Sequence, residues 1–447
     1  MKKILCFLAL FFLQSVFANT DELTVLNIHG IGPQLLNEVK QSPQVDWWLE
    51  MGDELLVVTA DNNHQWPPGV VVKTVLTDID VSSLAFHVLG HCDHSDNDQL
   101  LHDNLDPIFS GDLVRIINTS KIRDKNQLFA HKSILPFQKN SVLSYQISNR
   151  ALNKSLQRND DIQYVLNQVN QNRWFNQVDY LAGLNRMLEA DLMIAGEWLE
   201  NHFNALGLNT SRVSLHTNYR GFNVLGFQVG TTRADDWYVV GAHMDSRNQN
   251  KNDFLPSPGA EDNASGCSGV LEMAHVISQY KTEASIVYMC FIEEENGLKG
   301  SQEVVTHFTN TGDIAKIKGM LNMDMIGYRS PGNNTAVAGT NSQQYQSLAQ
   351  QVALNGQLYT DLDWQVSLNM CCTDFVSFSQ AGVPAVTSNE PDVWNYFAYH
   401  TVNDRAENID PSMGAGIVRA NLATLIDLVG VDFNSGDLIF AESFEAQ

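Results

Sequence analysis

Basic residues are scarce in this sequence, which carries 27 Lys and Arg against 51 Asp and Glu over 447 residues. The formal net charge is −24, and no stretch gathers the cationic side chains that phosphate groups require. This scarcity argues against a nucleic acid or an anionic membrane as the partner. Internal repeats and low-complexity tracts are lacking too, and the composition is that of a globular protein.

Long apolar runs are also lacking, apart from one at the N-terminus. Lys2 and Lys3 precede an apolar run that starts at Ile4, and Val16-Phe17-Ala18 has the small-residue pattern of a cleavage site. We therefore expect residues 1–18 to be a secretory signal peptide and the mature protein to be secreted, without a membrane span once the signal is removed. A buried N-terminal helix is the alternative.

Cysteine is scarce as well, with six residues in the chain. Cys6 would leave with the signal peptide, and the remaining five form an odd set, so at least one is unpaired or paired between chains. Cys267 and Cys290 lie in apolar segments and are expected to be buried thiols. Cys371 and Cys372 are adjacent and badly placed to bond to each other, and the sequence leaves the pairing open.

The pattern along the chain changes near residue 155. Residues 19–155 contain short strand-like runs, among them LTVLNI, ELLVVTA, GVVVKTVL and DLVRIIN, which polar turns separate. Residues 160–432 instead alternate strand-like and helix-like segments. We therefore predict an α/β fold, with a mostly parallel (mixed) central sheet and helices on both faces. A smaller β-rich region precedes it, and residues 433–447 form a tail.

Residues suited to metal binding follow the predicted strands of the second region. They are His243, Asp245, Asp262, Glu293, Glu294, Glu295, Asp324 and His400. Each alone has an ordinary explanation, since Asp262 could cap a helix and the glutamates could form a solvated first turn. The carboxyl ends of parallel strands meet at one edge of a sheet, however, so these side chains are expected to converge. Mixed imidazole and carboxylate ligands favour zinc.

Five segments make the pattern specific. They are GAHMDS, PGAEDNASG, EEENGLKGS, LNMDMIGY and YHTVNDRAENID, and they fall within about residues 165–430. In these segments the chain resembles the two-zinc (co-catalytic) aminopeptidase family that secreted bacterial leucyl aminopeptidases typify. The chain departs from many members at residues 373–375, where TDF stands in place of SDH.

The resemblance implies that five of these residues bind two zinc ions. Asp262 would bridge the two ions. His243 and Asp324 would complete the ligands of one ion, and Glu295 and His400 would complete those of the other.

The resemblance also implies roles for residues that are not ligands. Glu294 would be the general base, and Asp245 would orient His243 from behind. Asp404 is expected to support His400 in the same way. Glu293 is expected to be a solvated bystander, because a third inward-facing carboxylate would be difficult to compensate.

The implied function is a secreted, zinc-dependent aminopeptidase, a hydrolase that releases N-terminal amino acids from peptides with a free N-terminus. We expect it to be a monomer. A related zinc exopeptidase (a dipeptidase or carboxypeptidase) and a glutaminyl cyclase remain alternatives, and a binding protein without activity is a further one. Residues 19–155 are expected to be a propeptide, which would make the chain a zymogen, and an accessory domain is the alternative.

Overall fold

The computed structural model describes part of the chain. The described residues are 21–59, 65–79, 84–88, 107–110, 114–119, 134–136, 138–149, 157–214, 221–249, 251–392 and 395–435. The predicted signal peptide and all of the predicted tail after residue 435 lie outside these residues. Those two predictions therefore stay predictions.

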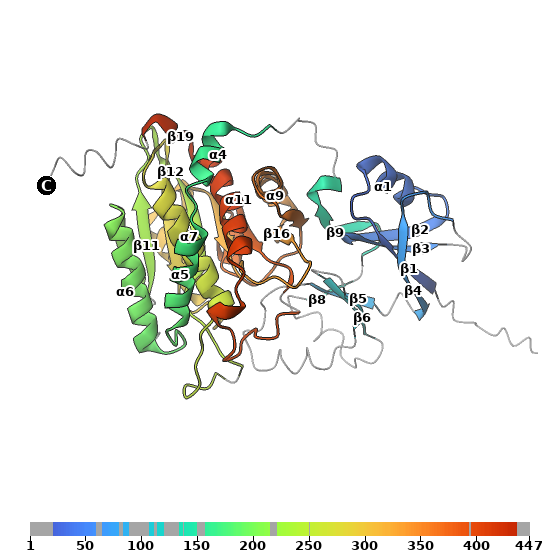
Figure 1. The fold of residues 1–447 in the computed structure, drawn as a ribbon, viewed down its shortest axis with the longest axis horizontal. Helices are drawn as coiled ribbons and strands as arrows, with labels where there is room; N and C mark the ends of the chain where they lie inside the picture. Colours follow the sequence, from blue (N-terminus) through green and yellow to red (C-terminus); the bar gives the residue numbers. More distant parts are fainter. Residues whose placement is uncertain are drawn as a thin grey trace, which may run out of the picture.

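A thirteen-stranded sheet runs through the molecule (Figure 1). In spatial order its strands are β10 (Asn209–Ser214), β11 (Phe222–Gln228), β14 (Ala284–Phe291), β12 (Arg233–His243), β15 (Ile317–Met323), β18 (Ala385–Asn389), β16 (Thr335–Gly339), β17 (Asp363–Ser367), β9 (Ser141–Gln146), β2 (Val45–Gly52), β3 (Glu54–Thr59), β1 (Asp21–Asn27) and β4 (Val71–Ile79). The strands from β14 to β18 run parallel to one another. Their carboxyl ends therefore lie at one edge.

Helices cover both faces of the sheet. They are α4 (Asp160–Leu166), α5 (Gln171–Ala182), α6 (Glu189–Ala205), α7 (Ser265–Ile277), α8 (Lys299–Thr311), α9 (Gln346–Tyr359), α10 (Phe375–Gln380) and α11 (Pro411–Val429). Successive strand residues point to opposite faces. Val240 and Ala242 of β12 accordingly pack in the core under α4 to α7, α9 and α11, whereas Val239 packs under α8 and α10. These layers confirm the predicted α/β fold.

Helix α11 differs from expectation in one respect. By length and composition it could cross a membrane, and it is the one such helix in the described part of the chain. The sequence led us to expect no second stretch of this kind. In the fold 78% of its apolar window is buried, and it packs on α5, α7 and α9. A helix that is apolar on all sides is also what the centre of a large core requires.

The N-terminal part is β-rich, as predicted. Besides its five strands in the large sheet, it contains α1 (Pro33–Lys40) and a second sheet of β6 (Pro107–Ser110), β7 (Val114–Asn118), β5 (Leu84–Val88) and β8 (Ile134–Pro136). A two-stranded sheet of β13 (Lys281–Thr282) and β19 (Val431–Asp432) lies elsewhere. Strand β9 pairs with both β17 and β2, so backbone pairing crosses the predicted domain boundary. The division into domains stays a prediction.

The thiols are placed as expected in two cases. Cys267 and Cys290 are buried and carry free thiols. Cys372 is disulfide-bonded, which identifies one of the bonded cysteines that the sequence leaves open.

Candidate metal centre

The predicted ligands converge at the carboxyl edge of the parallel strands. His243 is the last residue of β12, and Asp324 directly follows β15, which pairs with β12. Glu294 and Glu295 follow β14, the neighbour of β12 on its other side. Each apolar strand buries its length in the core and ends where the polar residue begins, so strand packing alone brings these side chains together.

Asp262 reaches the same place from a turn before α7. It lies in a short π-helical segment, Ala260–Ala264, in which Asp262 and Asn263 leave helical geometry. Gly259 precedes this turn with φ +52°, and a Cβ there would lie 2.4 Å from the Asp262 carbonyl oxygen. Only glycine fits this close approach without strain, so Gly259 helps to set the position of Asp262.

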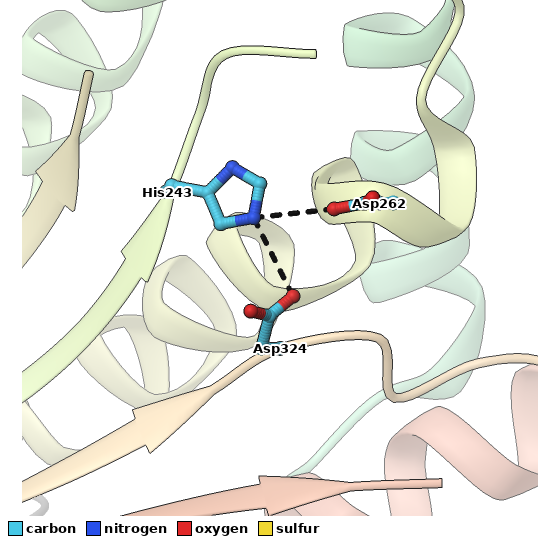
Figure 2. A group of neighbouring side chains, drawn as sticks. All are labelled: His243, Asp262 and Asp324. Carbon is cyan, nitrogen blue, oxygen red and sulfur yellow. Dashed lines mark ion pairs between the residues drawn. The ribbon is translucent and has the colours of Figure 1, made fainter. Parts of the chain in front are cut away.

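One group of three side chains consists of His243, Asp262 and Asp324 (Figure 2). His243 Nε2 lies 3.2 Å from Asp262 Oδ1 and 3.4 Å from Asp324 Oδ1. All three residues are buried, and Asp324 is fully so. Neither oxygen of Asp324 accepts a hydrogen bond from the described part of the chain. A buried carboxylate in this state requires a cation.

A second group consists of Asp262, Glu295 and His400. His400 Nε2 lies 2.8 Å from Asp262 Oδ2 and 3.3 Å from Glu295 Oε2. Asp262 therefore presents one oxygen to each group, as a bridging carboxylate would. Imidazole nitrogens and carboxylate oxygens suit zinc, so these residues fit two zinc ions, one for each group. Their role as ligands stays a prediction.

The electrostatics match this arrangement. Burial favours the neutral form of His243, but the carboxylates of Glu294 and Asp324 outweigh it and raise its pKa well above the usual range. His400 behaves alike, because Glu295 and Asp262 overcome burial and raise its pKa to about 9. For Asp262, hydrogen bonds to both imidazoles outweigh burial and lower its pKa. Without a metal, the two imidazoles of the site therefore favour their protonated, positively charged form, and the Asp262 carboxylate favours its negatively charged form.

Glu294 belongs to neither group but lies beside the first. Its Oε2 atom is 4.0 Å from His243 Nε2, and the side chain is buried. Burial raises the pKa of Glu294 well above the usual range, and the charges of Glu295 and Asp324 add to this effect while His243 opposes it. Such a carboxylate, next to a metal centre and outside the ligand set, is suited to proton transfer.

Asp245 is tied to both sides of this strand end. Its Oδ1 and Oδ2 accept the backbone N–H groups of Glu294 and Glu295, each at 3.2 Å. His243 Nδ1 lies 3.2 Å from the Asp245 backbone oxygen and 3.5 Å from its Oδ1. Besides lying behind His243, where the resemblance put it, Asp245 therefore holds the loop that carries Glu294 and Glu295, the predicted base and a predicted ligand.

Asp404 differs from its predicted role. Its carboxylate lies behind the bridging turn, not behind His400. Oδ1 accepts the backbone N–H of Glu261 at 2.8 Å, and Oδ2 accepts that of Asp262 at 3.1 Å. The Tyr396 hydroxyl donates to Oδ1 at 2.6 Å. Two successive backbone N–H groups of the turn bind both carboxylate oxygens of Asp404, and hydrogen bonds to a charged acceptor are strong.

The expectation for Glu293 is wrong. Its residue is 6% exposed, and Asn296 Nδ2 donates to Glu293 Oε2 at 2.8 Å. Glu293 has φ +55°, so the chain turns sharply after β14 and brings this carboxylate inside. A loop turn of this kind leaves no periodic pattern in the sequence.

Sequence analysis also missed the residues that connect the loops. The guanidinium of Arg186 is buried and donates to the backbone oxygens of Met244, Pro258 and Gly259, each at 2.7 Å. The buried Glu261 accepts the backbone N–H of Gly327 at 2.9 Å. Both side chains hold, through backbone atoms, loops that carry predicted ligands. Backbone contacts of this kind have no sequence signature, so no signal pointed to either residue.

Asp374, in the segment where the family resemblance breaks down, is fully buried. Burial raises its pKa to about 7, although the charge of His243 lowers it. The charges of Asp245 and Asp324 also act on Asp374. It therefore lies within electrostatic reach of the centre.

Residues 223–425 match the model of peptidase family M28. A "Probable zinc metalloprotease" of Pyrenophora teres f. teres is 39% identical over 99 residues, or 22% of this chain and 21% of the relative. A "Probable leucine aminopeptidase 1" of Trichophyton verrucosum is 35% identical over 159 residues, or 32% of this chain and 41% of the relative. The chain thus spans less than half of these relatives.

Solved structures share the fold more widely. The Legionella pneumophila LapA aminopeptidase superimposes with a TM-score of 0.55 at 18% identity, covering 78% of this chain and 98% of the LapA chain. LapB of the same organism gives a TM-score of 0.54 at 18% identity, with 78% and 99% covered. At this level of identity the likeness concerns the fold. The resemblance predicted from the five segments is confirmed by the family match.

Proposed function

We propose that this protein, whose residues 223–425 match the model of peptidase family M28, is a zinc-dependent aminopeptidase that removes N-terminal residues from peptides. The observation that carries the proposal is the shared Asp262. It joins two three-residue groups into one centre, and Glu294 lies at its side.

The proposed centre holds two zinc ions. His243, Asp262 and Asp324 would bind one ion, and Asp262, Glu295 and His400 would bind the other. When bound, such ions polarise a peptide carbonyl and activate water for attack.

The residues of the chain supply the remaining steps. Glu294 accepts the proton of the attacking water and then delivers it to the departing amine. Asp245 fixes the position of Glu294 by accepting its backbone N–H. Asp404 fixes the position of Asp262 by the same kind of hydrogen bond. The free α-amine of the substrate would be recognised by the carboxylates of the centre, which restricts cleavage to the first peptide bond.

The proposal extends to the fate of the protein outside the cell. Residues 1–18 direct export, and residues 19–155 act as a propeptide that is removed on maturation, after which the enzyme is a monomer. N-terminal sequencing of the secreted protein tests this part. A mature N-terminus near Asn19 contradicts the propeptide, and one near residue 155 supports it.

The activity is tested with leucine 4-nitroanilide, its N-acetyl derivative and a glutaminyl peptide, before and after dialysis against a chelator. We expect leucine 4-nitroanilide to be hydrolysed and its N-acetyl derivative to resist hydrolysis. The activity should be lost on chelation and return when zinc is added. Full activity at zero measured metal contradicts the metal centre. Rapid cleavage of the acetylated substrate points to another peptidase, and a pyroglutamyl product points to a cyclase.

A further inference from the structure

A cavity of about 320 Å³ adjoins the candidate metal centre on the side of Glu295. We call it the Arg247 pocket, and the side chains that matter here are Arg247, Lys251, Lys299, Glu293, Glu295 and Asn296. Since Glu295 belongs both to the second metal group and to the pocket wall, a substrate at the metals can extend into this space.

Cationic side chains gather in the Arg247 pocket. Arg247 has a side chain that is 6% exposed, and its Nε lies 3.9 Å from Glu295 Oε2. Lys251 and Lys299 are half-buried at the walls, and Lys251 Nζ lies 3.5 Å from Asn296 Oδ1. Four cationic and four acidic side chains line this cavity, so in a chain with 27 basic and 51 acidic residues the cavity is enriched in cations relative to the whole sequence.

Most acidic groups of the pocket are already engaged. Asp245 accepts two backbone N–H groups, Glu293 accepts Asn296 Nδ2, and Glu295 faces His400 and the proposed metal. Asp253 is exposed at the rim. An anion that enters would therefore meet guanidinium and ammonium groups, and the planar fork of arginine suits a carboxylate.

We propose that the Arg247 pocket binds a carboxylate of the peptide substrate. This inference rests on the proposed function, because the anions that an unmodified peptide carries are carboxylates. The negative chain repels acidic peptides in general, and the cations of the Arg247 pocket would supply a local attraction for a carboxylate at the site. The carboxylate could come from the side chain of the first or second residue, or from the C-terminus of a dipeptide.

Paired substrates distinguish these sources. Glu and Gln 4-nitroanilides test the first side chain, Leu-Glu-NH2 and Leu-Gln-NH2 test the second, and Leu-Gly and Leu-Gly-NH2 test the dipeptide C-terminus. We expect one pair to favour its carboxylate member in kcat/KM by roughly ten-fold, the worth of one charge-assisted hydrogen bond. Equal rates within all three pairs overturn the proposal.

Charge variants assign the preference to the pocket. Arg247→Lys keeps the charge but loses the fork, and Lys299→Gln removes a charge that is not beside a predicted ligand. Both should reduce the ratio between the carboxylate member and its neutral partner. Lys318→Gln is the matched control. Lys318 lies on β15, its side chain is 42% exposed and it pairs with Asp236, so this variant should leave the ratio unchanged. A ratio that survives in Arg247→Lys and in Lys299→Gln contradicts the assignment.

A binding measurement separates this inference from the activity. Calorimetry with uncleavable analogues of the same pairs, in which CH2 replaces the first peptide carbonyl, reports the preference without turnover. If no substrate is cleaved, the proposed activity is wrong. If the two members of every analogue pair also bind with equal affinity, the proposed carboxylate site is wrong as well. A carboxylate preference in binding that Lys299→Gln reduces supports the pocket whatever the rates.

Discussion

Asp245 and Asp404 lie behind two different loops of the candidate metal centre, and each carboxylate accepts two successive backbone N–H groups. Asp245 holds Glu294 and Glu295, which carry the proposed base and a ligand of one metal group. Asp404 holds Glu261 and Asp262, and Asp262 is shared by both groups. The same arrangement of hydrogen bonds therefore supports different residues in the two places. Substitution of Asp245 and of Asp404 should affect metal binding and catalysis differently.

The largest expected effect is on the number of zinc ions bound when a predicted ligand is replaced. Asp262→Ala should lose both ions, because each group loses a ligand. Glu295→Ala and Asp324→Ala should each fall from two ions toward one, with lower thermal stability, since metal bound to the native state stabilises it. Elemental analysis of the purified variants gives the stoichiometry. Two ions retained in Asp262→Ala would contradict the bridging role.

The next effect separates two neighbours on the Asp245 side. Glu294→Gln keeps shape and hydrogen bonding but cannot accept a proton, so kcat should fall by roughly 10²–10⁴-fold while zinc stays near two per chain. Glu295→Ala, by contrast, should lose zinc first. Steady-state kinetics beside metal analysis makes the distinction. Zinc lost from Glu294→Gln but retained in Glu295→Ala would show that the two roles are exchanged.

The two supporting aspartates can then be compared directly. Asparagine offers one acceptor oxygen, so Asp404→Asn and Asp245→Asn each leave one of two backbone N–H groups without its partner. Loss of such support typically weakens metal binding or activity by about 10–100-fold. Chelator competition should show both ions weakened in Asp404→Asn. In Asp245→Asn the ion at Glu295 should weaken more than the ion at His243, because the Asp245 backbone oxygen, which lies 3.2 Å from His243 Nδ1, is kept. Equal effects on both ions in the two variants would remove the difference between the two sides.

The last prediction concerns the pH dependence of metal affinity, which should change by a small factor at each pH step. In the metal-free protein the pKa of His400 is raised to about 9, so zinc must displace a proton from this imidazole below that pH. Affinity for the ion at His400 should therefore weaken as pH falls, by up to about ten-fold per unit between pH 9 and 7. Titrations at several pH values, with proton release measured in two buffers, check this. Affinity that is independent of pH contradicts it.

Much of this centre could be anticipated from the sequence, and the reason is local. β12, β14 and β15 are apolar runs whose ends are marked by His243, Glu294 and Asp324. Parallel strands in one sheet necessarily bring such ends together. Asp404 was assigned to the wrong partner, and Arg186 was missed, because their hydrogen bonds go to the backbone of distant loops. Glu293 was misjudged because a left-handed turn has no periodic signal.

The sequence by itself determined the α/β class, the strand ends and the residue types that can bind zinc, because periodicity and polarity act over a few neighbouring residues. The tertiary structure alone decided that Asp262 offers one oxygen to each imidazole, that two aspartates hold the ligand loops, and that Arg247 and two lysines surround one cavity. These features depend on contacts between residues far apart in the chain. Their distances follow from how the loops pack, which no local pattern encodes.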